Sequence, residues 1–218
     1  MDRYDILESI SQSQDGAMLE ENAVLAHVAD DIRRAVEDSR QDEGQSRSGR
    51  DYVMWLNEAE KRAAEAWAKE HDCWTDMSDI FRYGPPGPSG SESDTYIGNN
   101  GYIYKTNNLM HCGDSIIKTL TKFMMYNEVF VDSAYSFVGF AGFEGRSVFP
   151  VVRQRYIEGC TPATKTEIEY FMAALGFNSL GDGQYQNHRY HLKDVLPKNV
   201  LKDTTGDLYA IDVEIMPV

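Results

Sequence analysis

The sequence lacks the features that place a protein in a membrane, outside the cell or on nucleic acid. No apolar run is long enough to span a bilayer, and the acidic start Met1–Asp5 holds no apolar signal core. Basic residues are few, since 21 Lys and Arg stand against 35 Asp and Glu for a net charge of −14. Nucleic-acid binding needs a basic footprint. We therefore expect a cytoplasmic protein with no nucleic-acid partner and no membrane partner.

Cysteine is scarce as well. The three cysteines, Cys73, Cys112 and Cys160, lie far apart in the sequence. No CxxC pair or Cys/His spacing indicates zinc, and an odd number argues against a disulfide framework. We expect three reduced thiols.

The first 90 residues are acidic, holding 20 of the 35 acidic residues. Apolar residues at helical spacing predict helices over 18–38 and 51–70. Residues 41–50 contain no apolar side chain, which indicates a linker or a disordered stretch. Both helices fit a packing role, and partner binding by the first is the alternative. The predicted divisions are an acidic helical segment over 1–50, a helix with a Pro/Gly linker over 51–90, and a domain over 91–218.

The rest of the chain alternates between strand and helix patterns. The break Gly84–Gly90 holds three prolines and three glycines. After it we predict a hairpin (95–97 and 102–104, with an Asn/Gly turn), a helix (115–129), strands (135–140 and 147–157), a helix (166–175, closed by Gly176) and a hairpin (199–215) around residues 204–207. Such an order is typical of an α+β fold, with helices beside an antiparallel sheet.

The tail carries the strongest chemical pattern. Asp194 is followed five residues later by Asn199, and Asp212 ends the apolar strand that comes next. A loop with an acid and an amide, a tight hairpin and a second acid would bring the three side chains to one edge. In phosphoryl transfer one Asp orients a hydroxyl, while Asn and a second Asp hold the metal. One amide and one carboxylate suit Mg²⁺. Taken singly, these residues are also ordinary for turns and strand ends.

Two upstream features fit the same chemistry. The stretch Ser89–Ser93 supplies small residues and backbone N–H groups just before the first strand, and Lys105 ends the partner strand. Each feature also has an ordinary interpretation: the small-residue stretch as a linker, and Lys105 as a solvated lysine at a strand end. Their order is the informative part: small-residue loop, strand, turn, strand, lysine, helix.

These motifs occur in the order found in protein kinases, and the chain more narrowly resembles the short serine/threonine/tyrosine kinase domain of polyvalent proteins of phages and conjugative elements. The matching motifs, over roughly residues 60 to 218, are Ser91-Glu92-Ser93, Tyr104-Lys105, Asn127-Glu128-Val129-Phe130, Gly139-Phe140, Asp194–Asn199 and Ile211-Asp212. The resemblance implies a minimal kinase-like fold, with an antiparallel N-lobe sheet and one helix, a reduced C-lobe, and preceding N-terminal helices.

The resemblance also implies ATP and Mg²⁺ as cofactors and a role for each matching residue. Lys105 would pair with the α- and β-phosphates, and Ser91, Glu92 and Ser93 would lie over the phosphates. The backbone from Arg155 to Ile157 would face adenine as the hinge. Asp194 would orient the acceptor hydroxyl, while Asn199 and Asp212 would hold Mg²⁺.

The chain departs from the kinase pattern at several positions. Residues 113–127 contain no Glu to pair with Lys105, so Asp114 and Glu128 are the candidates at the two helix ends. Leu192 stands where kinases have His, and His191 is off by one. Six residues follow Asp212, leaving no activation segment, and Glu214 is a candidate second carboxylate for the metal.

The sequence thus favours an ATP- and Mg²⁺-dependent phosphotransferase acting on a protein or small-molecule hydroxyl. The alternative is a weak or inactive nucleotide-binding pseudokinase whose N-terminal helices engage a partner. A third interpretation is a fragment of a larger mobile-element protein.

Overall fold

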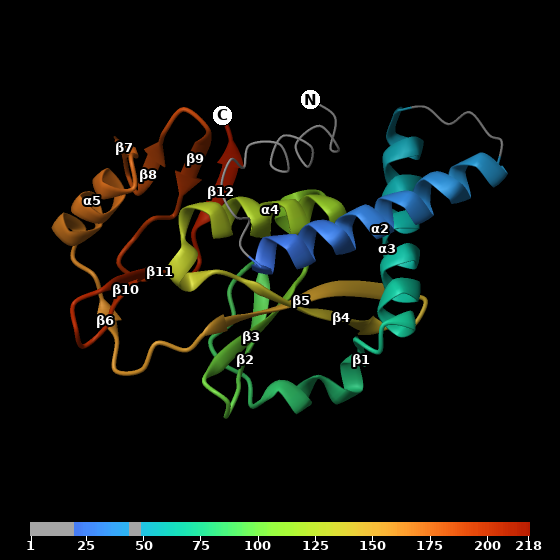
Figure 1. Cartoon of the computed structure of the whole chain (residues 1–218), viewed down its shortest axis with the longest axis horizontal. Helices are drawn as coiled ribbons and strands as arrows, with labels where there is room; N and C mark the ends of the chain where they lie inside the picture. The colour runs from blue at the N-terminus through green and yellow to red at the C-terminus, as the bar shows by residue number, and fades with distance from the viewer. Residues whose placement is uncertain (1–19, 44–48) are drawn as a thin grey trace. The chain divides into compact units, whose positions relative to one another are not determined.

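The computed structural model describes residues 20–43 and 49–218 (Figure 1). Internal contacts divide the chain into two compact units. The first comprises the described residues up to Met124 together with Tyr135–Gln154, and the second comprises Met125–Ala134 and Arg155–Val218. The division at residues 50 and 90 stays a prediction. No helix in the described ranges has the length and apolarity needed to cross a bilayer.

Two long helices, α2 (Glu20–Glu43) and α3 (Gly49–Glu70), open the first unit. The apolar face of α2 is buried, with Leu25 and Ile32 fully inaccessible, and both helices contact each other and strand β4 (Ser136–Phe143). The residues that predicted the first helix are thus used in packing. The predicted linker is too long, because helix continues through Glu43 and resumes at Gly49. A lack of apolar residues indicates that a stretch is solvated, but it does not exclude a helix. Gln and Glu, which occur in this stretch, favour the helical conformation. Residues 18, 19 and 44–48 lie outside the described ranges.

The first unit is built on a five-stranded sheet in the order β1-β4-β5-β3-β2. The predicted hairpin is confirmed as antiparallel β2 and β3, with Thr95 opposite Lys105. The two strands predicted after the helix are confirmed as β4 and β5, which also pair antiparallel. The bounds are β1 (Trp74–Asp76), β2 (Ser93–Ile97), β3 (Tyr102–Asn107) and β5 (Ser147–Arg155).

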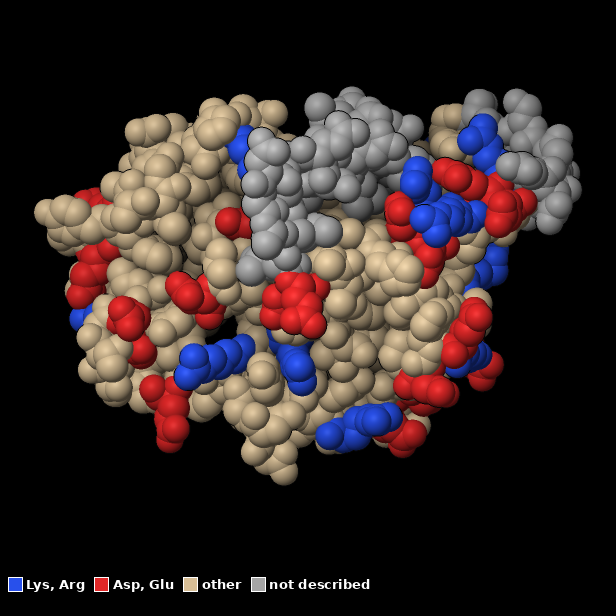
Figure 2. Space-filling view, in the orientation of Figure 1, with Lys and Arg blue, Asp and Glu red and all other residues tan. Residues whose placement is uncertain are grey.

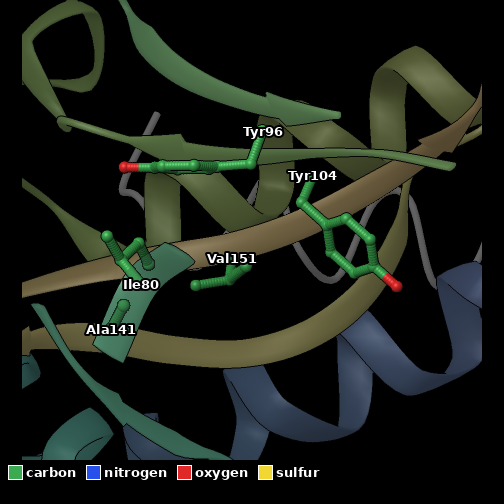
Figure 3. Close-up of a cluster of buried hydrophobic side chains, with 5 residues drawn as sticks. All are labelled: Ile80, Tyr96, Tyr104, Ala141 and Val151. Carbon is green, nitrogen blue, oxygen red and sulfur yellow. The ribbon is translucent and has the colours of Figure 1, made fainter. Parts of the chain in front are cut away.

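A compact apolar cluster covers part of this sheet. Its members come from four strands and from the 3-10 helix η1 (Met77–Tyr83): Ile80, Tyr96, Tyr104, Ala141 and Val151 (Figure 3). Tyr83 of η1 stacks on Tyr104 with ring centroids 4.8 Å apart. The cluster fixes the hairpin that carries Lys105, because Tyr104 directly precedes it.

Strand β1, absent from the sequence prediction, explains a glycine of the Gly-Phe motif. β1 pairs parallel with β4, with Trp74 opposite Phe140. A Cβ on Gly139 would lie 2.1 Å from the carbonyl oxygen of Cys73, and the backbone there has φ +153°. Only glycine allows this approach. The motif residue therefore serves strand packing.

The predicted helix after the hairpin is confirmed as α4 (Ile116–Val129). It begins in the first unit and passes into the second after Met124. In the first unit, the side-chain amide of Asn22 donates to the carbonyl of Met124 at 3.1 Å, which ties α2 to α4. Short 3-10 helices flank α4: η2 (Met110–Cys112) and η3 (Val131–Ser133).

The second unit combines one helix with two small antiparallel sheets. The predicted helix is confirmed as α5 (Lys165–Ala174), followed by Gly176 at φ +79°. The sheets have the orders β12-β9-β8-β7 and β11-β10-β6. Their strands are β6 (Thr161–Pro162), β7 (Asn178–Gly181), β8 (Gln184–Gln186), β9 (Tyr190–Lys193), β10 (Val200–Lys202), β11 (Leu208–Ala210) and β12 (Glu214–Pro217). The α+β class is confirmed.

The predicted tail hairpin is confirmed only in its inner part. β10 and β11 pair around residues 203–207, with Val200 opposite Ala210. Glu214–Pro217 leaves the hairpin and pairs with β9, placing Ile215 opposite Leu192. The buried side chains Val213 and Ile215 account for this switch, because they pack only when the chain turns back to β9.

Acid should weaken the start of α5 through Glu167. Glu167 and Thr164 form a capping box, and Lys202 binds Glu167 at 2.7 Å. The ammonium of Lys202, and then the N–H and hydroxyl of Thr164, lower the pKa of Glu167 from 4.5 to about 2. The stabilisation is therefore complete above about pH 4.5 and lost as the pH falls through about 2. Urea midpoints measured against pH should show that the deficit of Glu167→Gln, which keeps the cap, shrinks across this window. Lys202→Met should reproduce most of this pH dependence, and a deficit that stays constant down to pH 2 would contradict the assignment.

Charged side chains of both signs intermingle on the visible face. Figure 2 shows Lys and Arg groups lying beside Asp and Glu groups there, with no broad basic patch among the coloured residues of that face. Ion pairs such as Lys61–Asp114 agree with this pattern.

Candidate active site

The loop Asp194–Asn199 is closed by its own ends. Asn199, only 5% exposed, donates from Nδ2 to both the Oδ2 and the carbonyl oxygen of Asp194, at 2.8 Å each. Asp194 has φ +56°, a left-handed conformation that Asp and Asn tolerate better than most residues. The predicted acid and amide are therefore in direct contact.

The hairpin brings Asp212 to the same place. The N–H of Ile211 donates to the carbonyl oxygen of Asn199 at 2.9 Å, and Asp212 is the next residue. The hydroxyl of Tyr126 donates to the carbonyl of Ala210 at 2.7 Å and anchors β11. The structure thus gathers Asp194, Asn199 and Asp212 within the second unit, 18 residues apart in sequence at the extremes.

Lys198 links the two carboxylates electrostatically. Its Nζ lies 2.9 Å from Oδ2 of Asp194. The hydrogen bond to Asp194 and its charge raise the pKa of Lys198, and Asp212 adds a smaller effect of the same sign. Sequence reasoning assigned no role to Lys198, although it stands inside the motif. The lysine thus adds one positive charge to a site with two carboxylates.

The donor set fits a magnesium ion. Because Nδ2 of Asn199 donates to Asp194, Oδ1 is the side-chain atom of Asn199 that could ligate a metal. Asp212 is exposed and contributes a carboxylate. Mg²⁺ commonly uses one or two such oxygens and completes its shell with phosphates and water.

The β7–β8 turn contacts the Asp194–Asn199 loop through a backbone hydrogen bond. The N–H of Val195 donates to the carbonyl oxygen of Gly183 at 3.0 Å. Gly183 has φ +72°, and a Cβ there would lie 2.7 Å from Cδ2 of Leu196. The turn thus fixes the residue that directly follows Asp194, and the positive φ of Gly183 favours glycine at that position.

In the first unit, Lys105 is buried at 8% exposure and contacts an aromatic residue. Its Nζ lies 3.4 Å from the hydroxyl of Tyr135 and 5.2 Å from the ring centroid. Tyr135 in turn packs on Phe123 of α4, with centroids 4.9 Å apart. α4 therefore orients the lysine through aromatic side chains, which sequence reasoning missed.

The loop Ser91–Ser93 is tied to both the hairpin and α4. The Glu92 carboxylate accepts two hydrogen bonds of 2.7 Å from Lys122 of α4, and His111 lies 2.8 Å away. The side chain of Asn108 donates to the carbonyl of Ser91 at 2.7 Å. Lys122 stands out in the sequence as a charge among the apolar residues of α4. The Lys122–Glu92 contact joins α4 to the Ser91–Ser93 loop, whereas kinases usually join this helix to the strand lysine.

Neither candidate carboxylate, Asp114 before α4 or Glu128 near its end, pairs with Lys105. Asp114 binds Lys61 at 2.6 Å. Glu128 accepts from the Tyr190 hydroxyl at 2.5 Å and binds Arg189 at 2.9 Å. Burial and the Glu128 carboxylate raise the pKa of Tyr190 far above its usual value. Both acids are thus committed to structural contacts.

Most of the remaining predicted residues lie in strands or at strand ends. Arg155 ends β5, and the division between the units falls between Gln154 and Arg155, so Arg155–Ile157 opens the second unit. His191 contacts Gln184 across β8 and β9 at 3.2 Å, and Leu192 is fully buried. Glu214 begins β12 opposite Lys193.

The comparison with protein families agrees with the motif order. The family described as serine/threonine/tyrosine kinase found in polyvalent proteins matches residues 57–216. No curated protein gave a match to the chain. The family match spans most of the 218 residues, from within α3 to β12. The chain therefore belongs to the serine/threonine/tyrosine kinases found in polyvalent proteins.

Proposed function

We propose that the protein transfers the γ-phosphoryl group of ATP, with Mg²⁺, to a hydroxyl of a protein or small molecule. Family membership supports kinase chemistry. The observation that carries the proposal is the convergence of Asp194, Asn199 and Asp212 through the closed loop and the hairpin. These are the residue types that hold the nucleophile and the metal in phosphoryl transfer.

The second unit supplies the chemistry in this proposal. Asp194 takes the proton of the acceptor hydroxyl as the new oxygen–phosphorus bond forms, the β–γ bridging bond breaks and ADP leaves. Asn199 and Asp212 hold Mg²⁺, which neutralises phosphate charge when bound. Lys198 keeps Asp194 oriented through its 2.9 Å contact.

The first unit supplies phosphate contacts in this proposal. Lys105 binds the α- and β-phosphates, and the backbone N–H groups of Ser91, Glu92 and Ser93 face the phosphates. The Glu92 side chain is engaged by Lys122, which supports an anchoring role for it. The backbone from Arg155 to Ile157 faces adenine, as in a minimal kinase fold with a small sheet-and-helix lobe.

A second candidate is a nucleotide-binding pseudokinase. It is favoured by the commitment of Asp114 and Glu128 to Lys61, Tyr190 and Arg189, which leaves α4 without the carboxylate that usually orients the lysine. Positioning carries most of the rate in phosphoryl transfer. Nucleotide binding without turnover would identify this candidate, and a partner surface on the N-terminal helices stays a prediction.

Titration calorimetry with Mg-ATP tests the proposal. We expect binding by the wild type and a loss of about ten- to hundredfold in Asp212→Ala, because a charge-assisted contact is worth about 1.5–3 kcal/mol. Removing Mg²⁺ with EDTA should weaken ATP binding by the wild type strongly and ATP binding by Asp212→Ala only slightly. Asp207→Ala, an exposed acid on the same hairpin, is the matched control and should bind as the wild type does. Absence of Mg-ATP binding in the wild type would refute the proposal.

A further inference from the structure

A cavity of about 450 Å³ lies in the second unit beside the loop that carries Asp194. It is lined by residues of α5, of the β7–β8 hairpin and of the loop segment Val195–Pro197. Its volume falls in the range of small-ligand and side-chain pockets, about 300–1,000 Å³. The wall is continuous in sequence with the proposed acceptor-orienting carboxylate, since Val195 directly follows Asp194.

The floor of the cavity is apolar. Ile168, Tyr185 and Val195 line it, and each is at most 6% exposed. A floor of this kind suits the aliphatic stem of a Lys or Arg side chain, whose charged head stays at the rim.

The rim is acidic. Glu169 and Asp182 line it against one ammonium, that of Lys165. Among the side chains of the described ranges, neither carboxylate has an ion-pair or hydrogen-bond partner. Two unpaired carboxylates above an apolar floor complement a cation.

The neighbouring strand favours a polypeptide as the occupant. β7 is the edge strand of its sheet, and its four residues are exposed. Ser179 and Gly181 of β7 also line the cavity. An exposed edge offers backbone hydrogen bonds to an extended chain, which a small alcohol would not use.

We propose that this cavity receives the acceptor, an extended polypeptide segment whose Lys or Arg side chain enters between Glu169 and Asp182. Val195 lines the cavity and directly follows Asp194, and each residue of an extended chain spans about 3.3–3.6 Å. We therefore expect the basic residue within about three residues of the phosphorylated hydroxyl. The inference rests on the proposed function and assigns its substrate class.

Fluorescence anisotropy without nucleotide tests the cavity alone. The probes are fluorescein-labelled dodecapeptides with one serine and one arginine, the arginine placed at each position within three residues of the serine. The matched probes carry citrulline, a neutral isostere of arginine. For at least one arginine position we expect the wild type to bind the arginine peptide about fivefold more tightly than its citrulline counterpart, as for an exposed ion pair worth up to about 1 kcal/mol.

Variants of the lining residues should change the preference for arginine over citrulline in opposite directions. Glu169→Gln combined with Asp182→Asn should abolish the preference for arginine, while Lys165→Gln should enlarge it by removing a like charge. Asp132→Asn, an exposed acid of the second unit outside this cavity, should leave it unchanged. Equal affinity for arginine and citrulline peptides at every position, or a preference that survives in the double variant, would overturn the inference.

A phosphorylation assay with the same peptides separates this inference from the proposed function. Charge-selective binding without phosphate transfer supports the cavity and counts against the phosphotransferase. Transfer that ignores arginine and the double variant supports the phosphotransferase and overturns the cavity, as does transfer to a small amino alcohol with no transfer to peptides.

Discussion

Asp194→Asn is expected to lower kcat for phosphoryl transfer by about 10²–10⁴-fold, the range of a general base, while leaving the fold intact. Asparagine keeps the shape of the side chain and tolerates the left-handed backbone at φ +56°. It removes the carboxylate that we propose as proton acceptor and that holds Lys198 at 2.9 Å. Incorporation of radiolabelled phosphate from γ-labelled ATP into an acceptor peptide measures the loss.

A backbone control makes this result specific. Asp194→Gly also suits the positive φ and should be as inactive as Asp194→Asn, whereas Asp194→Ala adds strain and should also lower the melting temperature. Binding of Mg-ATP should persist in Asp194→Asn because Asn199 and Asp212 remain. Turnover within threefold of the wild type in Asp194→Asn would exclude Asp194 as the base. A wild type that binds Mg-ATP without turnover would favour the pseudokinase.

The gathering of Asp194, Asn199 and Asp212 could be predicted because its causes are local. A tight turn at residues 203–207 returns the chain within a few residues, and the 5-residue spacing in the loop places Asn199 beside Asp194. Turn residues in the sequence predict local geometry of this kind. The chemical role of each residue stays a prediction, resting on the family and on this geometry.

Contacts between distant residues were beyond sequence reasoning. Glu92 and Lys122 lie 30 residues apart, and their pairing depends on which way α4 faces. Strand β1 has only three residues, and it pairs in parallel with β4 around Phe140. Such contacts arise only when packing of the whole unit sets the directions of the elements.

The sheet β7–β9 was missed for a compositional reason. The residues of β7 are polar or exposed, and Gly181 and Gly183 break the strand pattern, so the stretch resembles a loop. Its value lies in holding Val195 through the carbonyl of Gly183 and in framing the acidic cavity. The part of the second unit with the weakest sequence signal therefore carries the inference about the acceptor.

A buried carboxylate of the first unit supports the Ser91–Ser93 loop, for which we propose phosphate binding. Glu60 of α3 is fully buried, and its Oε2 accepts from the Ser115 hydroxyl at 2.7 Å and from the Ile117 N–H at 3.2 Å. Ile117 lies in the first turn of α4, where N–H groups lack helical partners and the helix dipole favours a negative charge. Since α4 carries Lys122, this carboxylate fixes the helix that holds Glu92.

Glu60→Ala should therefore destabilise the protein by about 3 kcal/mol or more, because two buried donors lose their acceptor at about 1–3 kcal/mol each. Glu60→Gln retains an acceptor oxygen and should lose less. Glu58→Ala, an acid on the same helix whose side chain is 59% exposed, is the matched control and should change stability by about 0.5 kcal/mol or less. Urea midpoints give the stabilities, and hydrogen exchange of the Ile117 amide should rise in Glu60→Ala alone. If Glu60→Ala matched Glu58→Ala in both measurements, α4 would not depend on this carboxylate, and the link from α3 through Lys122 to the Ser91–Ser93 loop would fail.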